Sequence, residues 1–187
     1  MSGDAAAEDA LMEQVDSLIG QGYVEREKAV EVADAVPEVR ARILDWLRLA
    51  FESGDWRRFE RQAGVAVHLH PEGLGSILAP VLASRAQGVN SEDLIDMLGE
   101  LRDSEGVEPI SSLVRERKDS DGPFFALCIK GLQSLAEIGT PEALQFLRVV
   151  ATSASGEWPD SLRWHAAEEL GIEDELGFDE DLMLGGA

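Results

Sequence analysis

The sequence predicts an all-α protein built as an α-α superhelix, a solenoid of stacked helix pairs, and a repeated helix start is the main reason. A Pro-Glu pair or its Val-Glu equivalent begins at residues 37, 71, 107 and 141, so the intervals are 34, 36 and 34 residues. Each copy carries an aliphatic residue at its seventh position. A period of this length is typical of solenoids, in which a helix pair buries its apolar face only against neighbouring pairs.

The copy at residue 141 shows most clearly why a helix begins there. Thr140 is a favourable N-cap residue, and Pro141 follows at the first helical position, where its missing N–H has no helical partner to lose. Glu142 places a negative charge in the first turn, where the helix dipole stabilises it. Leu144 and Leu147, three residues apart, begin the buried stripe of this predicted helix.

Two helices precede the repeats and are expected to cap that end of the solenoid. Residues 1–8 are rich in alanine and acids, and we expect them to be frayed. Apolar residues at helical spacing predict a helix over 9–19, which the Gly-Gln-Gly segment at 20–22 ends. A second helix is predicted over 26–36, so residues 9–36 form the N-terminal capping helices.

Residues 37–171 are expected to hold the repeats, each with a first and a second helix. Asp55 and Asn90 are placed to cap first helices, and the segments 118–123 and 152–159 are predicted loops. The helix predicted over 124–138 is the most apolar, so we expect it at the centre of the core. Residues 160–170 form the last regular helix in this prediction.

The acidic C-terminal segment, residues 172–187, has two interpretations. Acids alternate there with apolar side chains, among them Ile172, Leu176 and Phe178. The segment can form a capping helix over the last apolar face of the solenoid, or it can be an acidic tail offered to a partner. We prefer the cap, because an uncovered solenoid end exposes apolar surface.

The stretch from about 124 to 171 resembles a known repeat family. Leu-x-x-Leu-Ala-x-Ile-Gly at 132–139 is followed by Thr-Pro-Glu-Ala-Leu at 140–144 and, after a loop, by Ala-Ala-Glu-x-Leu-Gly at 166–171. This pattern is similar to the HEAT-like repeats of bacterial and phycobilisome-lyase-related proteins, whereas residues 37–118 share only the period. The resemblance implies a HEAT-like α-solenoid. It implies no single activity, because scaffolds, inhibitors, lyases, hydroxylases and DNA glycosylases share this frame.

The bulk composition favours one soluble domain over residues 1–187. A hydrophobic content of 44% is enough for a core, and an aromatic content of 6% suits helices packed through aliphatic side chains. No apolar run approaches the roughly 20 residues that cross a bilayer, and the first residues lack the basic and apolar regions of a signal peptide. We expect a cytoplasmic protein, and the excess of Arg over Lys, 13 to 3, is typical of a GC-rich bacterial genome.

The net charge of -21 is unevenly distributed. Residues 1–36 carry nine acids and two bases, and residues 155–187 carry ten acids and one base, so the acidity is concentrated at the two ends. Acidic ends repel nucleic acid and anionic membranes and attract basic surfaces. They also serve as polar caps that keep a solenoid soluble. The partner predicted from this charge is a protein with a basic surface, not a nucleic acid or a membrane.

Few residues suggest catalysis. His165 and Glu169 share a helix face, and His68 and His70 flank a helix end, but nothing in their spacing brings three metal ligands together. The iron-binding deoxyhypusine hydroxylases of this fold class have repeated His-Glu dipeptides, which this chain lacks. Cys128 lies among apolar residues, which raise the pKa of a thiol and leave it unreactive. We therefore predict no catalytic residue, no metal and no cofactor.

Partner contacts are predicted on the second helix of each pair, because in the families that this chain resembles those helices line the concave wall. Residues that depart from the aliphatic pattern there are the candidates: Arg48, Ser111, Arg115, Gln145 and Arg148. Each can equally be an ordinary solvated residue.

The favoured function is therefore a non-enzymatic, acidic protein-binding scaffold, and its sharper form is an inhibitor or immunity protein that blocks a cationic toxin or nuclease. The alternatives are a HEAT-like enzyme of the lyase or metal-dependent kind, and a nucleic-acid mimic whose carboxylates imitate phosphates. The oligomeric state is left open.

Overall fold

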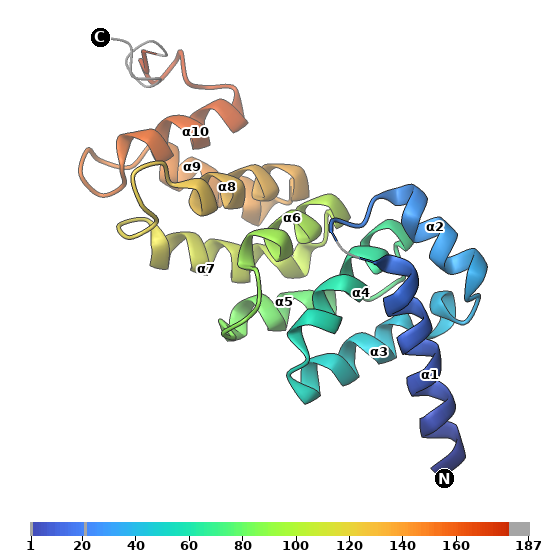
Figure 1. The fold of residues 1–187 in the computed structure, drawn as a ribbon. Helices are drawn as coiled ribbons and strands as arrows, with labels where there is room; N and C mark the ends of the chain where they lie inside the picture. Colours follow the sequence, from blue (N-terminus) through green and yellow to red (C-terminus); the bar gives the residue numbers. More distant parts are fainter. Residues whose placement is uncertain (1, 21, 180–187) are drawn as a thin grey trace. The chain divides into compact units, whose positions relative to one another are not determined.

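A computed structural model describes residues 2–20 and 22–179, and apart from an isolated bridge between Ser155 and Trp158, all regular structure in these ranges is helical (Figure 1). The prediction of an all-α protein is confirmed. In chain order the helices are α1 (Ser2–Ile19), α2 (Arg26–Ala35), α3 (Val39–Ser53), α4 (Trp56–Leu69), α5 (Gly75–Ser84), α6 (Ser91–Leu101), the 3-10 helix η1 (Ser104–Gly106), α7 (Val107–Arg117), α8 (Ala126–Ile138), α9 (Pro141–Ala151) and α10 (Asp160–Leu170).

The repeated helix starts mark the second helix of four successive pairs. The helices α7 and α9 begin at residues 107 and 141 themselves, whereas α3 begins two residues after Pro37 and α5 begins four residues after Pro71. In chain order these are α3, α5, α7 and α9, which is every second helix, with α10 after the last of them. The interval read from the sequence is thus the spacing of every second helix start along the chain.

Two predicted caps form the expected hydrogen bonds. The backbone N–H of Ala143 donates to Oγ1 of Thr140 over 3.3 Å, and Pro141 occupies the first turn of α9. The backbone N–H of Arg58 donates to the Asp55 carboxylate over 3.1 Å at the start of α4. Each cap satisfies a backbone donor that the first helical turn leaves without an internal acceptor.

The chain divides into two compact units, where the sequence predicted one continuous domain. The N-terminal unit contains α1 to α4 and the start of α5, together with residues 85–90. The C-terminal unit contains residues 78–84 and the helices from α6 onward. The division runs through α5, which has Pro80 in its interior.

The C-terminal unit consists of two helix layers around α8. One layer contains α6, α8 and α10, in which each helix contacts the next, and the other contains α7 and α9, which contact each other and α8 (Figure 1). A β-carbon added at Gly131 of α8 would lie 2.5 Å from Cγ2 of Val114 in α7, so the layers meet closely at this point. Helix α8 lies at the centre of this unit, as predicted, and its neighbours form a solenoid-like stack.

The N-terminal unit is held together by α2 and α4, which contact each other, while α3 and α1 pack against them. Helix α1 begins at Ser2, earlier than the predicted start at residue 9. The carboxylate of Glu8 explains part of this extension, because it accepts a 2.9 Å hydrogen bond from Nε1 of Trp46 and lies 3.0 Å from Nη1 of Arg42. These two contacts anchor the helix upstream of its apolar stripe.

The C-terminal segment does not form the preferred capping helix over its described part. Residues 172–179 follow α10 as turns, and Leu176 is 40% exposed. Phe178 contacts α10 through the guanidinium of Arg163, which lies 5.4 Å from the ring centroid. Residues 180–187 lie outside the described ranges, so the choice between cap and tail stays a prediction for them.

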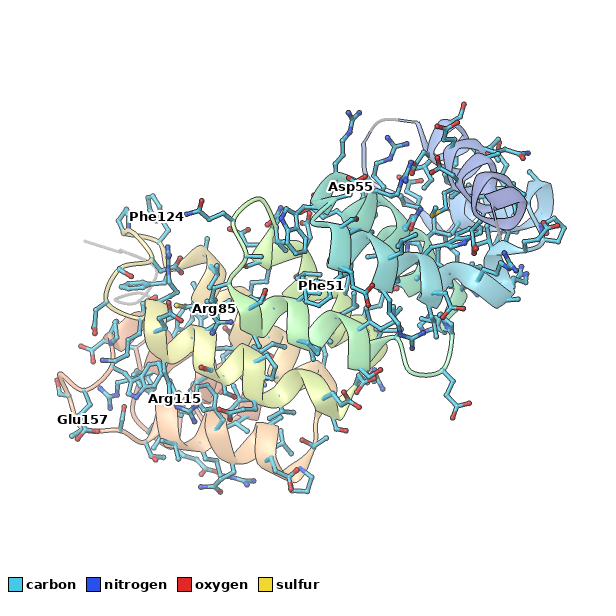
Figure 2. All side chains as sticks on the ribbon, turned by 90° about the horizontal axis from the view of Figure 1, so that it is seen from below. Phe51, Asp55, Arg85, Arg115, Phe124 and Glu157 are labelled. Atoms are coloured by element: carbon cyan, nitrogen blue, oxygen red, sulfur yellow. The ribbon has the colours of Figure 1, made fainter. Side chains whose placement is uncertain are left out.

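Phe124 also differs from its predicted place in the core. It is 82% exposed and projects from the loop before α8, which begins at Ala126 (Figure 2). The next residue, Phe125, has a positive φ of 49°, and the Asp121 carboxylate accepts a hydrogen bond of 2.8 Å from the backbone N–H of Cys128. The loop reaches α8 through a left-handed residue, and this turn leaves Phe124 outside.

Candidate functional site

The predicted contact residues are divided between the two units. Arg48 is exposed on α3 of the N-terminal unit, where its guanidinium pairs with Asp45 of the same helix over 2.8 Å. Gln145 and Arg148 are exposed on α9 of the C-terminal unit. Arg115 is exposed on α7, and its guanidinium lies 4.6 Å from the ring centroid of Phe146.

Ser111 is buried, with 2% of its surface exposed, so its prediction as a contact residue is wrong. It lies on α7 beside Ile110 and one turn before Val114, which are both fully buried. A polar residue that interrupts an aliphatic pattern was expected to face solvent. Here the small side chain is accepted into the core, where no described group forms a hydrogen bond with its hydroxyl.

A hollow of about 410 Å³ lies in the other layer of the same unit, between α6 and α8. Three of its lining residues carry carboxylates, namely Asp96, Glu100 and Glu137. The other lining residues are Gly99, Arg102, Gln133 and Ser134. Neither histidine nor cysteine occurs in this lining. We call this feature the α6–α8 hollow.

Small residues bring α6 and α8 together at the hollow. A β-carbon added at Gly99 would lie 2.7 Å from Oε2 of Glu137 and 2.8 Å from Oγ of Ser134, distances that side chains essentially never adopt. The bare Cα of Gly99 therefore allows a carboxylate and a hydroxyl of α8 to converge over α6. Gly64, Gly99 and Ser134 recur at intervals of 35 residues, and this second period was the sequence signal that could have identified the hollow.

The direction of the helices adds negative potential. The ammonium of Lys130 on α8 contacts Asp96 on α6, and further along both helices Ser134 lies against Gly99. Residue numbers therefore increase together on the two helices, which means that α6 and α8 run in the same direction. Both end beside the hollow, at Leu101 and Ile138. The C-terminus of a helix carries about half a negative charge, and two parallel C-termini therefore favour a cation at this place.

The pKa values of two charged side chains in this layer are also shifted in the direction that neighbouring acids produce. The hydrogen bond from Lys130 to Asp96, 2.7 Å long, raises the pKa of Lys130 above its ordinary value, and the charges of Asp96, Glu92 and Asp93 add to it while burial opposes it. On the neighbouring helix α10, burial first and then the charges of Glu168 and Glu137 raise the pKa of Glu169. The charges of neighbouring acids thus contribute to both shifts.

The whole α6, α8 and α10 layer is acidic, whereas the α7 and α9 layer is balanced. The first three helices carry eight acidic and two basic residues, and the other two carry three of each. The two layers belong to one unit, so this contrast is a property of its fold. Counting charges along the chain does not show it, because helices of the two layers alternate in sequence.

A second hollow, of about 370 Å³, lies in the N-terminal unit and contains the densest basic cluster of the sequence. Arg57, Arg58 and Arg61 line it together with two acids. Nε of Arg58 contacts Asp16 of α1 over 2.9 Å, and the guanidinium of Arg61 donates to the backbone carbonyl of Asp16. An acidic helix of the same unit therefore already occupies much of this basic cluster.

The histidines and the cysteine have structural contacts. Nε2 of His68 lies 2.8 Å from the Val24 carbonyl oxygen, and Nδ1 of His165 lies 3.4 Å from Glu168. Cys128 is fully buried, and burial together with Asp121 raises the pKa of its thiol to about 12. This confirms the predicted direction of the pKa shift. Within residues 2–20 and 22–179, no three His, Cys, Asp or Glu side chains are placed to hold a metal ion.

No family model matches the chain, and no curated protein or solved structure matches it either. The HEAT-like resemblance therefore stays a prediction. Among the described helices, none has the length and apolar character that crossing a membrane requires.

Proposed function

We propose that this chain is a non-enzymatic protein-binding module that takes a basic surface of its partner on the α6, α8 and α10 layer. The observation that carries the proposal is the charge contrast between the layers, with eight acids against two bases on this one. Complementary charge accelerates association and selects partners by sign. An inhibitor of a cationic toxin or nuclease is the sharper form of the same proposal, and a cytoplasmic location goes with it.

This layer replaces the one proposed from the sequence. The second helices α7 and α9 carry Arg115 and Arg148, and their balanced charge gives a basic partner no preference for them. The acidic layer also contains the α6–α8 hollow, which is a recess lined by polar side chains. A basic partner thus has both a field that attracts it and a recess that orients it.

The test uses a synthetic arginine-rich peptide and a glutamine-substituted peptide of the same length. We expect the basic peptide to bind, with affinity that falls as salt rises, and the neutral peptide not to bind. The triple variant Asp96→Asn, Glu100→Gln, Glu137→Gln removes three acids from the layer. The matched control Glu108→Gln, Glu116→Gln, Glu142→Gln removes three acids from α7 and α9.

The two triple variants separate a binding face from general charge attraction, because both change the net charge by the same amount. The proposal predicts that the first variant binds at least about tenfold more weakly than the control. Equal weakening in both variants would mean that the peptide follows net charge alone, and the proposed binding face would be wrong.

A further inference from the structure

We propose that Asp121 and Gly122 form a site of spontaneous covalent modification, at which the aspartate converts to isoaspartate, and that this conversion removes the cap of α8. The two residues lie in the loop 118–125 between α7 and α8, from which Phe124 projects (Figure 2). They are the only Asp-Gly pair in the sequence. The inference is independent of the proposed binding face, because it concerns the chemistry of this loop alone.

The reaction needs only the backbone, the carboxyl group and water. The nitrogen of Gly122 attacks Cγ of Asp121, and the new N–Cγ bond closes a succinimide ring. One carboxyl oxygen leaves as water, with the amide proton and a proton from solvent. A water molecule then opens the ring by breaking the bond between this nitrogen and the backbone carbonyl carbon of Asp121. The main chain now runs through Cγ with an additional methylene group, and the former backbone carbonyl has become a free carboxylate.

The first support is the attacking nitrogen, which has neither a cover nor a partner. Gly122 is exposed, and apart from its chain neighbours no atom lies within 4 Å of the position that a β-carbon would take. Within the described residues, its N–H donates no hydrogen bond. An amide that is hydrogen-bonded or shielded by a side chain must give up these contacts before it attacks, and the amide of Gly122 has none to give up.

The second support is the contrast with the preceding acid of the same loop. Asp119 is followed by Ser120, whose N–H donates to the carbonyl oxygen of Arg117 over 2.8 Å. Asp119 is exposed, whereas Asp121 is only half-buried, so exposure by itself would favour modification at Asp119. The state of the following nitrogen favours Asp121 instead, and the two acids therefore distinguish the two causes.

The carboxylate that the reaction consumes is also the cap of α8. It accepts the 2.8 Å hydrogen bond from the N–H of Cys128 in the first turn of this helix. The hydrogen bond competes with ring closure, because both use the carboxyl group of Asp121. After ring opening, the carboxylate is attached at a different place on a longer backbone, and the N–H of Cys128 loses its acceptor. The modification thus weakens the start of the helix at the centre of the C-terminal unit.

The experiment incubates the folded full chain at neutral pH and digests samples with trypsin over time. Cleavage after Lys118 and Lys130 releases the peptide 119–130, which contains both aspartates of the loop. We expect a second peptide with the same mass and a different retention time to accumulate, and fragmentation to place isoaspartate at Asp121. If no isoaspartate forms in the folded chain, the proposal is wrong. Equal conversion of Asp119 would also overturn it, because exposure of the loop would then be sufficient.

Variants test the geometry of ring closure. Asp121→Asn should form the same ring with loss of ammonia, and faster, because a neutral amide does not repel the nitrogen as a carboxylate does. The matched control Asp119→Asn should react about tenfold more slowly, because the next nitrogen must first release the carbonyl of Arg117. Gly122→Ala should slow the reaction by covering the nitrogen. Its positive φ of 80° strains alanine, so the two Asn variants decide the result if this variant does not fold.

Amide hydrogen exchange, measured by NMR, tests the loss of the cap. The amide of Cys128 should exchange faster in the modified chain than in the fresh chain. The amide of Ala143, which is capped by Thr140 at the start of α9, is the control and should not change. Unchanged exchange at Cys128 would show that the cap survives the modification, and this part of the proposal would be wrong.

Discussion

The acidic residues of helices α1 and α6 have different neighbours. Helix α1 carries five acids and no base, and it packs in the N-terminal unit beside α4, which has three arginines and one acid. Arg58 of α4 lies 2.9 Å from Asp16 and 3.6 Å from Asp9. Three acids of α1, namely Glu8, Asp9 and Asp16, thus lie beside arginines of their own unit.

Helix α6 carries four acids and no base, but its neighbour α8 supplies a single lysine. Lys130 lies 2.7 Å from Asp96 and 3.9 Å from Glu92. Helices α6 and α8 together thus carry five acids and one base. The comparison teaches that acidic residues at the N-terminal end of the sequence pair within their own unit, whereas the α6 acids are the basis of the binding face proposed above.

The largest expected effect comes from breaking the contact that neutralises α1. The hydrogen bond and charge of Asp16, with help from Asp55 and Asp9, raise the pKa of Arg58 although burial lowers it. Arg58→Ala leaves the partly buried Asp16 without its cation, and we expect unfolding to become easier by about 2–3 kcal/mol. Urea denaturation measures this change.

A double-mutant cycle sharpens the same comparison. The side chains of Arg58 and Asp16 are 24% and 22% exposed, against 30% and 52% for Lys130 and Asp96. We expect a coupling free energy of about 1.5–3 kcal/mol for the first pair and below about 1 kcal/mol for the second. Equal couplings would contradict the expectation that the more buried Arg58–Asp16 pair contributes more to stability than the Lys130–Asp96 pair.

A smaller loss is expected when α1 loses its upstream anchor. Glu8→Ala removes the acceptor for the Trp46 indole and the partner of Arg42, so it should cost about 1–2 kcal/mol. Glu13→Ala, an exposed acid on the same helix, is the matched control and should change stability by less than about 0.5 kcal/mol. The two thermal unfolding curves are compared directly, and coincident curves would show that Glu8 does not anchor the helix.

Asp121 represents a third use of an acid, as a helix cap. Asp121→Ala removes the acceptor for the Cys128 N–H and should destabilise the chain by about 1 kcal/mol. Burial and then the charge of Asp121 raise the pKa of the Cys128 thiol to about 12, so this variant should also lower that pKa. Alkylation across alkaline pH measures it, and Asp119→Ala is the control in the same loop. An unchanged thiol pKa would remove Asp121 as a cause.

The smallest effect has the opposite sign. Folding raises the pKa of Glu169, so the ionised form is disfavoured in the folded state and stability is lost as pH rises through that folded pKa. Glu169→Gln should therefore stabilise the chain at neutral pH, by about 0.5 kcal/mol or less because the group is exposed and screened. The gain should vanish at pH values below the ordinary pKa of glutamate. A gain that persists there would have another origin.

Several elements could be predicted because their causes are local. The Thr140 cap with Pro141 and the Asp55 cap depend on residues within one turn, and the structure has both. Residues 160–170 form α10 as predicted. Ser111 and Phe124 could not be placed in this way, because burial depends on how closely a neighbouring helix approaches and on how the chain enters it.

The sequence by itself determined the helices and their interval, since capping, helix dipoles and apolar spacing act over a few residues. Only the tertiary structure decided which acids are neutralised, because Asp16 contacts Arg58, which is 42 residues away in the sequence. It also brought Gly99 of α6 against Ser134 of α8. Charge interactions depend on distance in space rather than along the chain. The α6–α8 hollow exists for the same reason: helices that are separated in sequence become neighbours in one layer.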